Sequence, residues 1–420
     1  MKNKTKRVLV IAYHYPPLAG AGVLKTLRTT RYLLQFGWQP LVLTVQNPEP
    51  YHRAANPVPE GVKVYRTWRI PGGNLLARIL RRLGLDERWL LLPDQHILWF
   101  PGAVIAGLYL IIRRKVDLIY VTGPPYSALM AGAALRRITG KPLVVEVRDP
   151  WSFNAGRQGY PSRFHRFLDR RYERWVLRAA ALITCIYQIT AKGYLELYPW
   201  TKDKLKVFYD TVDLQDLPPT YEYYPVFTLT YLGTFYPPFA TLDATLKAIK
   251  GLLDEGIISP DTFRFNYVGP LDKTFEARVD SFGLTSIVDF SGYKPLREAQ
   301  LEVFKSQALL LLLEFATINT KLFDYLAGGR MILAVVPEFP ELRGLLERYA
   351  ANYTLVSDLD HQKIAGTLKQ WYNDFYQGKL ANNAAKVDLF KAELNIEAET
   401  RELVKKFDEV CQARLRRIRA

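Results

Sequence analysis

The sequence contains 420 residues, of which 49% are hydrophobic and 13% aromatic, so it has room for about two folded domains and is too apolar for a disordered chain. The two cysteines, Cys185 and Cys411, lie far apart, and the five histidines show neither HxxxH nor HExxH spacing, which argues against a disulfide framework and a zinc site. The net charge of +16 is uneven: residues 1–200 carry 30 Lys and Arg against 11 Asp and Glu, whereas residues 201–420 carry 27 against 30. An anionic partner is therefore expected at the first half of the chain.

The chain begins with "MKNKTKRVLVIA", in which the apolar run is only as long as a strand. No apolar run of signal-peptide length and no cleavage site follow, so the sequence predicts a cytoplasmic protein.

Apolar segments of strand length alternate with amphipathic helical segments in the first half of the chain. Continuous apolar strands between helices predict a parallel sheet that is covered on both faces. The predicted strands are 7–12, 40–45, 62–66, 117–121, 143–147, 181–185 and 205–208, and the clearest helices are 23–36, 126–138 and 162–179.

Prolines cluster at 213–226, where the periodicity stops, and this segment is predicted to be a linker. The same alternation then resumes with strands at 227–233, 263–269, 287–292, 307–313 and 331–336, and a polar helix ends the chain at about 385–418. We therefore predict an α/β protein with two doubly wound domains facing a cleft. The expected boundaries are 1–212 for the N-terminal domain, 227–384 for the C-terminal domain, and 385–420 for a helix that packs back towards the N-terminal domain.

The stretch "YHYPPLAGAG", residues 13–22, connects the first predicted strand to the first predicted helix. Ligands of open α/β sheets bind at the carboxyl ends of the strands, so Gly20 and Gly22 are expected to let an anion approach the start of the helix. The spacing is not GxGxxG, and no acidic residue ends the second strand, which argues against an NAD site. A tight turn without a ligand is the alternative.

Further motifs follow this opening in order: "GWQPLVLT" (37–44), "VEVRDPW" (145–151), "LKVFYDTVD" (205–213), "FNYVGPLD" (265–272), "FSGYKP" (290–295) and "NTKLFDYLAGGRMILAV" (319–335). Together they resemble the GT-B glycosyltransferases, in particular the retaining group known as family four. The resemblance spans essentially the whole chain. It implies two Rossmann-like domains, of which the second binds a nucleotide sugar.

The resemblance also implies which residues bind the donor: Gly20, Gly22, Gly233, Thr234, Val268, Gly269, Gly292, Tyr293, Glu314, Asn319, Thr320, Lys321 and Asp324. Asp324 stands where the family has the second Glu of its E-x7-E motif, which binds the ribose. Lys321 and the helix that begins beside it are expected to neutralise the diphosphate without a metal ion or another cofactor. Arg148, Asp149 and Lys321 are the predicted catalytic residues. Arg148 and Asp149 would orient the acceptor hydroxyl or the donor sugar, and a structural ion pair is the alternative.

The sequence departs from the family pattern at several places, of which two concern the donor site. The first Glu of E-x7-E would fall at Ala316, and the nearest acid is Glu314. The Arg and Lys that follow the first strand of the second domain are absent. These departures leave open a degenerate, non-catalytic protein that scaffolds polysaccharide assembly. An epimerase-like GT-B enzyme is a further alternative, although its catalytic histidine and carboxylates cannot be placed.

Arginines recur beside aromatic residues in the first half, and the set comprises Arg81, Arg82, Arg88, Trp89, Arg163, Arg166, Arg170 and Arg174. Such helices bind anionic lipid, so these residues are expected at a membrane or acceptor surface, unless their apolar neighbours pack on the sheet. The apolar stretch 97–112 is shorter than the ~20 residues that span a bilayer. No nucleic-acid-binding motif accompanies the arginines. The resemblance, together with this basic surface, implies a retaining hexosyltransferase on the inner face of the cell membrane. It would transfer sugar from a nucleotide diphosphate to a lipid-linked or polysaccharide acceptor in cell-surface glycan synthesis.

Overall fold

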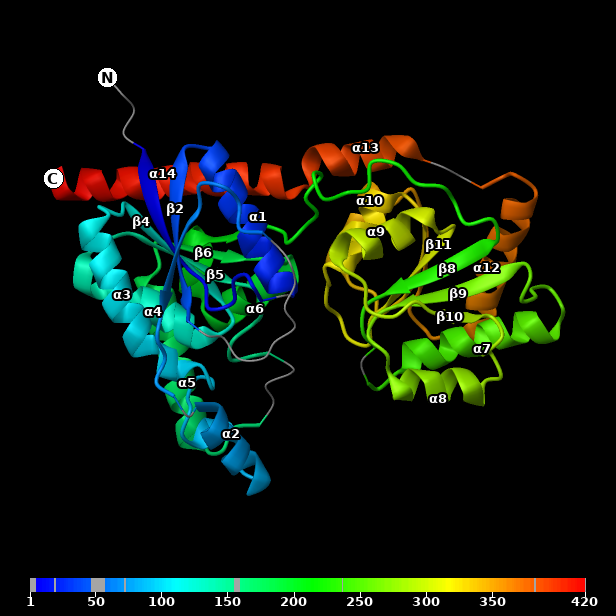
Figure 1. Ribbon diagram of the computed structural model, residues 1–420, viewed down its shortest axis with the longest axis horizontal. Coiled ribbons are helices and arrows are strands. Elements are labelled where there is room, and N and C mark those ends of the chain that lie inside the picture. Colours follow the sequence, from blue (N-terminus) through cyan, green and yellow to red (C-terminus); the bar gives the residue numbers. More distant parts are fainter. Residues whose placement is uncertain are drawn as a thin grey trace. The chain divides into compact units, whose positions relative to one another are not determined.

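The computed structural model describes residues 5–18, 20–46, 57–71, 73–154, 159–235, 237–380 and 383–419. The chain divides into two compact units, of which the first contains Met1–Asp210 and Ile396–Ala420 and the second contains Thr211–Asn395. Each unit has its own parallel sheet with helices on both faces (Figure 1). This arrangement confirms the predicted fold class of two doubly wound Rossmann-like domains.

The sheet of the first unit has seven parallel strands in the order β3-β2-β1-β4-β5-β6-β7. These strands are β1 (Lys6–Ile11), β2 (Trp38–Val45), β3 (Lys63–Thr67), β4 (Leu118–Gly123), β5 (Leu143–Val147), β6 (Leu182–Cys185) and β7 (Leu205–Val207). The order reverses between β1 and β4, which are neighbours in the sheet but not in sequence. A topological switch point of this kind opens a crevice at the carboxyl ends of the two strands.

Helices cover both faces of this sheet because successive residues of its strands point in opposite directions. Leu9 and Ile11 pack with α3 (Phe100–Arg113), α4 (Tyr126–Thr139) and α5 (Arg163–Ala179). Val8 and Val10 face the other way, towards α1 (Ala21–Gln35) and α14 (Ile396–Arg419). The remaining helices are α2 (Gly73–Arg82) and α6 (Gln188–Leu197), with short 3-10 helices η1 (Glu87–Trp89), η2 (Ile97–Trp99) and η4 (Pro199–Lys204).

The end of the chain differs from the single helix that was predicted at 385–418. It forms two helices, α13 (Ala384–Glu393) in the second unit and α14 in the first. They are separated at Leu394 and Asn395, where the Asn395 side chain donates a hydrogen bond to the carbonyl of Lys391. α14 packs on the first sheet through Phe407, whose ring lies 5.5 Å from the rings of both Trp38 and Tyr120.

The sheet of the second unit has six parallel strands in the order β10-β9-β8-β11-β12-β13, with a switch point between β8 and β11. The strands are β8 (Phe227–Leu232), β9 (Phe263–Val268), β10 (Val288–Phe290), β11 (Ala308–Leu312), β12 (Met331–Val335) and β13 (Asn352–Val356). β13 was not predicted. It is an edge strand that pairs only with β12 among the described residues, and its first four residues are partly exposed, so its sequence lacks the continuous apolar run of the other strands.

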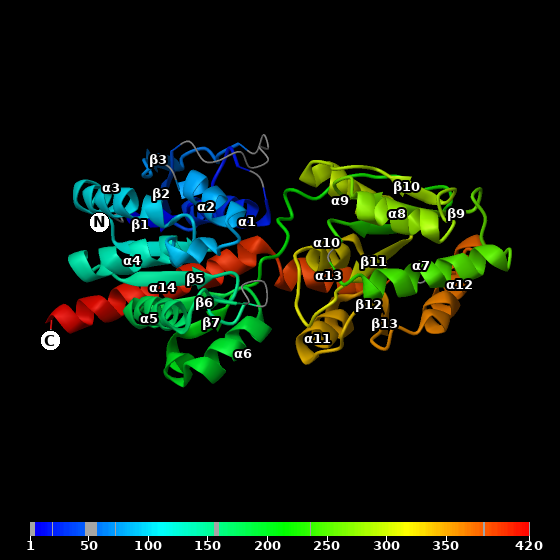
Figure 2. The ribbon, with the colours of Figure 1, turned by 90° about the horizontal axis from the view of Figure 1, so that it is seen from below.

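Helices again lie on both faces of this second sheet (Figure 2). One face packs against α7 (Ala240–Asp254), α8 (Lys273–Ser281) and α12 (His361–Tyr376). The other face carries α9 (Leu296–Lys305), α10 (Lys321–Gly328) and α11 (Pro340–Tyr349), beside α13.

No helix in the described part of the chain is long and apolar enough to cross a bilayer. The predicted apolar stretch 97–112 forms η2 and most of α3. Trp99, Ala103 and Leu110 are buried, whereas Ile105 and Ile112 are exposed.

Candidate active site

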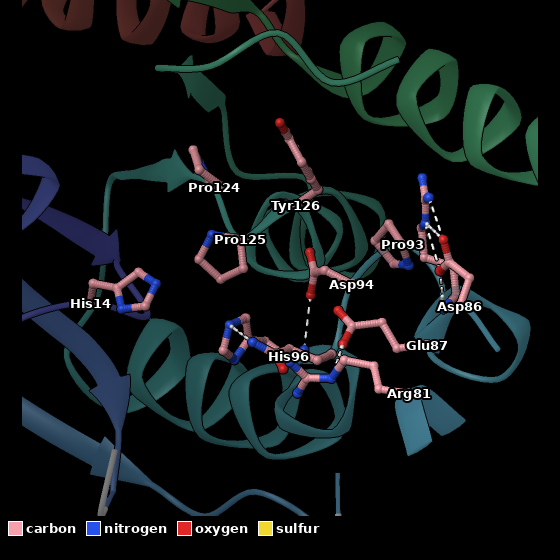
Figure 3. A pocket seen from close by; sticks show the side chains of 12 residues that line it. His14, Arg81, Asp86, Glu87, Pro93, Asp94, His96, Pro124, Pro125 and Tyr126 are labelled. Atoms are coloured by element: carbon pink, nitrogen blue, oxygen red, sulfur yellow. Dashed lines mark hydrogen bonds and ion pairs between the residues drawn. The ribbon is translucent and has the colours of Figure 1, made fainter. Parts of the chain in front are cut away.

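A pocket lies at the switch point of the first sheet, where β1 and β4 end. Its lining comprises His14, Arg81, Asp86, Glu87, Arg88, Pro93, Asp94, Gln95, His96, Pro124, Pro125 and Tyr126, and its volume is about 580 Å³. His14 follows β1, and Pro124 to Tyr126 follow β4, so two neighbouring strands supply one side of the pocket. In Figure 3, His14 lies at one end of the pocket and Asp86 at the other. The volume is in the range of small-ligand sites.

His14 and His96 form an imidazole pair at this pocket, with ring centroids 5.7 Å apart. Burial, followed by the proximity of His96 and of the Arg148 guanidinium, lowers the pKa of His14 to about 3. The ring is therefore neutral at physiological pH and offers one hydrogen-bond donor and one acceptor. A group with so low a pKa is a weak base, so His14 is suited to hold a ligand hydroxyl rather than to take its proton.

Asp94 fixes the segment that forms another wall of the pocket. Its carboxylate accepts hydrogen bonds from the backbone N–H of Ser127 at 3.0 Å, the Ser127 hydroxyl at 2.9 Å and the backbone N–H of His96 at 3.0 Å. Because this carboxylate contacts the first turn of α4, it also interacts favourably with the dipole of that helix. Asp94 thus ties residues 94–96 to the start of α4.

Sequence reasoning did not find His14, Asp94 or His96. They do not form a motif, and Asp94 and His96 lie far along the chain from β1 and β4. The strand order would have been the useful signal, since His14 lies in the loop after β1 and the switch point falls between β1 and β4.

Arg148 follows β5 and is 8% exposed. Its guanidinium donates to the carbonyl oxygens of Gly22 at 2.5 Å and Pro124 at 2.7 Å, which joins the start of α1 to the loop after β4. A Cβ atom at Gly22 would lie 2.1 Å from Arg148 Nη1. Gly22 therefore lacks a side chain because Arg148 occupies that space, which differs from the expectation of an open approach for a ligand. A Cβ atom placed on Gly20, by contrast, would have no neighbouring atom within 4 Å, and the φ of +122° at this position favours glycine.

The "RDPW" segment is anchored on α5. Trp151 Nε1 donates to Asp169 at 2.9 Å, and the backbone N–H of Trp151 donates to the hydroxyl of Tyr194 at 3.0 Å. Asp149 is exposed between the buried residues Arg148 and Trp151. The structure thus gives Arg148 a positioning contact with backbone carbonyls and leaves Asp149 accessible.

A buried ion pair lies beneath this loop. Lys25 Nζ is 3.3 Å from Glu146, which also accepts hydrogen bonds from Tyr120 and Thr122 at 2.7 Å each. Burial alone would raise the pKa of Glu146, but Lys25 and Arg148 outweigh it and lower that pKa. Because the pair is hydrogen-bonded on both sides, it holds α1 and β5 in a fixed arrangement.

The predicted donor-binding residues of the second unit converge at the carboxyl end of its sheet. Gly233 and Thr234 follow β8, and Gly292 and Tyr293 follow β10. Val268 is the last residue of β9, and Gly269 comes directly after it. The segment after β11 contains Glu314, Asn319, Thr320, Lys321 and Asp324, of which the last two lie in α10. The Gly233 N–H donates to the carbonyl of Val268 at 2.8 Å. A Cβ at Gly269 would lie 2.4 Å from the Gly233 carbonyl, so the loops after β8 and β9 meet in direct backbone contact.

Lys321 lies beside Gly233 at the switch point between β8 and β11. Its Nζ donates to the Tyr231 hydroxyl at 2.7 Å and would lie 3.3 Å from a Cβ placed on Gly233. Burial lowers the pKa of Lys321 to about 7. The family's Arg and Lys after the first strand of this domain are absent from the sequence, and the structure brings the amine of Lys321 to the same end of β8.

The two predicted carboxylates have different partners. Glu314 accepts hydrogen bonds from the backbone N–H of Thr241 at 3.1 Å and from the Thr241 hydroxyl at 2.8 Å, in the first turn of α7. Asp324 accepts a hydrogen bond from the side-chain amide of Gln300 at 2.8 Å. Asn319 Oδ1, just before α10, is buried without a hydrogen-bond partner among the described residues. Glu314 therefore stabilises a helix, whereas Asp324 and Asn319 lie at the start of α10.

Arg88 and Arg330 have roles that the sequence did not indicate. Arg88, expected at the acceptor surface, forms an ion pair with Asp86 and is thereby neutralised. Arg330 precedes β12, at the amino end of the strands, and it donates to the Tyr221 hydroxyl at 2.7 Å. Arg81, Arg82, Trp89, Arg163, Arg166, Arg170 and Arg174 are exposed.

Residues 7–209 match the sequence profile of the glycosyl transferase 4-like domain. No curated protein sequence matches the chain significantly.

Solved structures resemble the chain over nearly its full length. Sucrose-phosphate synthase from Thermosynechococcus elongatus has a TM-score of 0.71 at 12% identity, over 97% of this chain and 100% of that chain. HepE from Anabaena, in complex with UDP, has a TM-score of 0.63 at 14% identity, over 96% and 100%. The lipopolysaccharide outer core galactosyltransferase WaaB, in its apo form, has a TM-score of 0.60 at 12% identity, over 97% and 99%. The chain therefore has the GT-B fold of these solved structures, and its residues 7–209 match the glycosyl transferase 4-like domain.

Proposed function

We propose that this protein is a retaining glycosyltransferase that moves a hexosyl group from a nucleotide diphosphate sugar to a lipid-linked or polysaccharide acceptor. The family of residues 7–209 supports glycosyl transfer. The presence of UDP in HepE supports a nucleotide donor, and the galactosyltransferase WaaB supports a role in cell-surface glycan synthesis. We place the reaction at the cytoplasmic face of the membrane.

One observation carries the donor side of the proposal: Lys321 Nζ lies beside Gly233 at the switch point of the second sheet. Ligands of open α/β sheets bind there, and α10 begins at Lys321, so its free N–H groups point towards the same place. An ammonium group and a helix N-terminus together neutralise a diphosphate, and we infer that they do so without a metal ion.

Asp324 and Asn319 supply acceptors for hydroxyl groups at the start of α10. We assign Asp324 to the ribose hydroxyls, and Asn319 Oδ1, which is buried without a partner among the described residues, to a further hydroxyl of the donor. The base would lie between Gly269 and the exposed ring of Tyr293. Each assignment rests on the position of these residues at the carboxyl end of the sheet.

The acceptor is assigned to the pocket that contains His14 and His96. In the retaining reaction, the bond from the anomeric carbon to the phosphate oxygen breaks, and the acceptor oxygen forms its new bond on the same face of the sugar. The acceptor proton passes to the leaving phosphate, so no protein base is needed. The neutral His14 ring then orients the hydroxyl, and the exposed Asp149 after β5 remains a candidate to orient the acceptor or the donor sugar.

A thermal-shift series with UDP-, GDP-, ADP- and dTDP-sugars, each with and without EDTA, tests the donor assignment. A donor at a hundredfold excess over its Kd stabilises the folded state by about 2.7 kcal/mol. We expect a shift with one nucleotide that is insensitive to EDTA and is lost in Asp324→Ala. The matched control is Asp261→Ala, an exposed acid that precedes β9 at the other end of the same sheet.

The alternatives give different results in this series. No shift with any donor would favour the degenerate scaffolding protein. A shift accompanied by interconversion of the donor sugar, without an acceptor, would favour the epimerase-like enzyme. An equal loss in both Asp variants would contradict the ribose assignment.

A further inference from the structure

We propose that α2, η1 and the first half of α5 form one surface that binds an anionic lipid bilayer, so that the adjoining pocket receives an acceptor anchored in lipid. The acceptor part of this inference rests on the proposed glycosyl transfer. The lipid-binding part does not depend on it.

α2 presents apolar side chains to solvent instead of burying them. Leu75 and Ile79 on the helix and Leu83 just after it are exposed, and the exposed fraction of Leu83 is 67%. Only Ala77 and Leu80 among its described side chains are buried. Exposed apolar residues so close together mark an interaction site rather than an ordinary surface.

η1 joins α2 to α5. Arg88 donates to the Gly159 carbonyl, and the rings of Trp89 and His165 are 4.9 Å apart. Trp89 and Leu90 remain exposed beside this contact. η1 therefore contacts both α2 and the start of α5.

The first half of α5 adds two exposed aromatic rings, Phe164 and Phe167. It also adds positive charge. The exposed arginines of the whole surface are Arg78, Arg81, Arg82, Arg163, Arg166 and Arg170.

Negative charge on this surface is confined to η1 and its cap, where Asp86 pairs with Arg88 and Glu87 lies 3.9 Å from Arg81. α2 contains no acidic residue. The two acids of α5, Asp169 and Glu173, are fully buried, where Asp169 binds Trp151 and Glu173 binds Tyr198. Arginines without exposed acids between them, interspersed with leucine and aromatic side chains, are complementary to anionic headgroups above an apolar layer.

The pocket opens among the same segments. Arg81, Glu87 and Arg88 line it, while Leu83, Trp89 and Leu90 of the same stretch form the exposed apolar surface. A molecule held in the bilayer by a lipid chain would therefore present its polar head at the pocket. Of the two acceptor classes in the proposed function, the geometry points to the lipid-linked one.

Co-sedimentation of the full chain with vesicles tests the surface directly. We expect binding to vesicles of phosphatidylglycerol and phosphatidylcholine in equal amounts, at least tenfold weaker binding to phosphatidylcholine alone, and weaker binding at high salt. Leu75→Glu with Leu83→Glu should reduce binding to the anionic vesicles at least tenfold. The matched control is Ile105→Glu with Ile112→Glu on α3, which are exposed to the same degree and should leave binding unchanged.

A second variant guards against misfolding, since Arg82→Glu with Arg170→Glu replaces only exposed side chains. It should also weaken vesicle binding, with thermal unfolding unchanged. Equal binding to both kinds of vesicle, or loss of binding only in the α3 variant, would overturn the proposal. So would a dimer in light scattering that the α2 variant dissociates, because the surface would then bind a second copy.

The acceptor assignment has its own readout. In the α2 variant, the donor-induced thermal shift should persist while sugar transfer into chloroform-soluble membrane material falls at least tenfold. Unchanged transfer would reject the lipid-linked acceptor. If no donor produced a thermal shift in the wild-type chain, the proposed function would be rejected instead.

Discussion

Lys321 provides the sharpest test of the donor site because its charge changes near physiological pH. Its pKa is lowered to about 7 by burial. A diphosphate binds the ammonium form, whereas the free lysine loses its proton as the pH rises above 7. The nucleotide sugar itself keeps its charge over this range. Donor affinity should therefore fall with rising pH, and the protein must take up a proton on binding.

The size of this pH effect on donor affinity follows from the lowered pKa of Lys321. At pH 6 the amine of the free protein is mostly protonated. At pH 9, two units above the pKa, only about one molecule in a hundred carries the protonated amine. This difference corresponds to ~2.7 kcal/mol of lost binding free energy. We expect a Kd about a hundredfold higher at pH 9 than at pH 6, measured by isothermal titration calorimetry with the donor identified above.

Two variants separate this cause from others. Lys321→Met should weaken the donor at pH 6 and remove the pH dependence, whereas Lys247→Met, an exposed lysine on α7, should change neither. Lys321→Arg keeps its charge at every pH in this range and should flatten the profile. A wild-type Kd that is constant between pH 6 and pH 9 would refute the reasoning, because it would show that the Lys321 charge does not contact the phosphates.

Three further predictions concern the first unit. Gly22→Ala should lower the free energy of unfolding by about 1–3 kcal/mol because the new Cβ displaces the Arg148 guanidinium, and in an Arg148→Ala background the same change should cost little. Urea unfolding followed by tryptophan fluorescence measures this cycle, and additive effects would contradict the contact. The His14 ring, whose pKa is lowered to about 3, should show no NMR titration between pH 5 and pH 8, and a midpoint near 6.5 would show that it is accessible to water. Burial raises the pKa of Glu399 on α14 to about 7, so the folded state binds an extra proton between pH 4.5 and 7 and loses stability as the pH rises through that range. Glu399→Gln should therefore raise the free energy of unfolding by about 1–3 kcal/mol at pH 8 and leave it unchanged at pH 4, while equal effects at both pH values would contradict the assigned shift.

The sequence by itself determined the two sheets and most of the strands. Segments such as "RVLVIA" and "QALLLLL" are apolar on both faces, and only a parallel sheet between helix layers buries such strands completely. The predicted donor residues of the second half lie at the carboxyl end of the sheet, because they end a strand, follow one or begin the next helix, and parallel strands all end at the same edge. β13 was missed because an edge strand needs fewer apolar residues.

Only the tertiary structure decided which side chains share a site. Arg148 fills the space over Gly22, and Lys321 lies beside Gly233, although each pair is separated by many residues in the sequence. His14 and His96 meet because strand order places β1 next to β4, which no local pattern records. The burial of Asp169 and Glu173 leaves the start of α5 with only positive charge at its surface, and helical periodicity alone did not distinguish that surface from a mixed one. These outcomes depend on long-range packing, which the local spacing of residues does not specify.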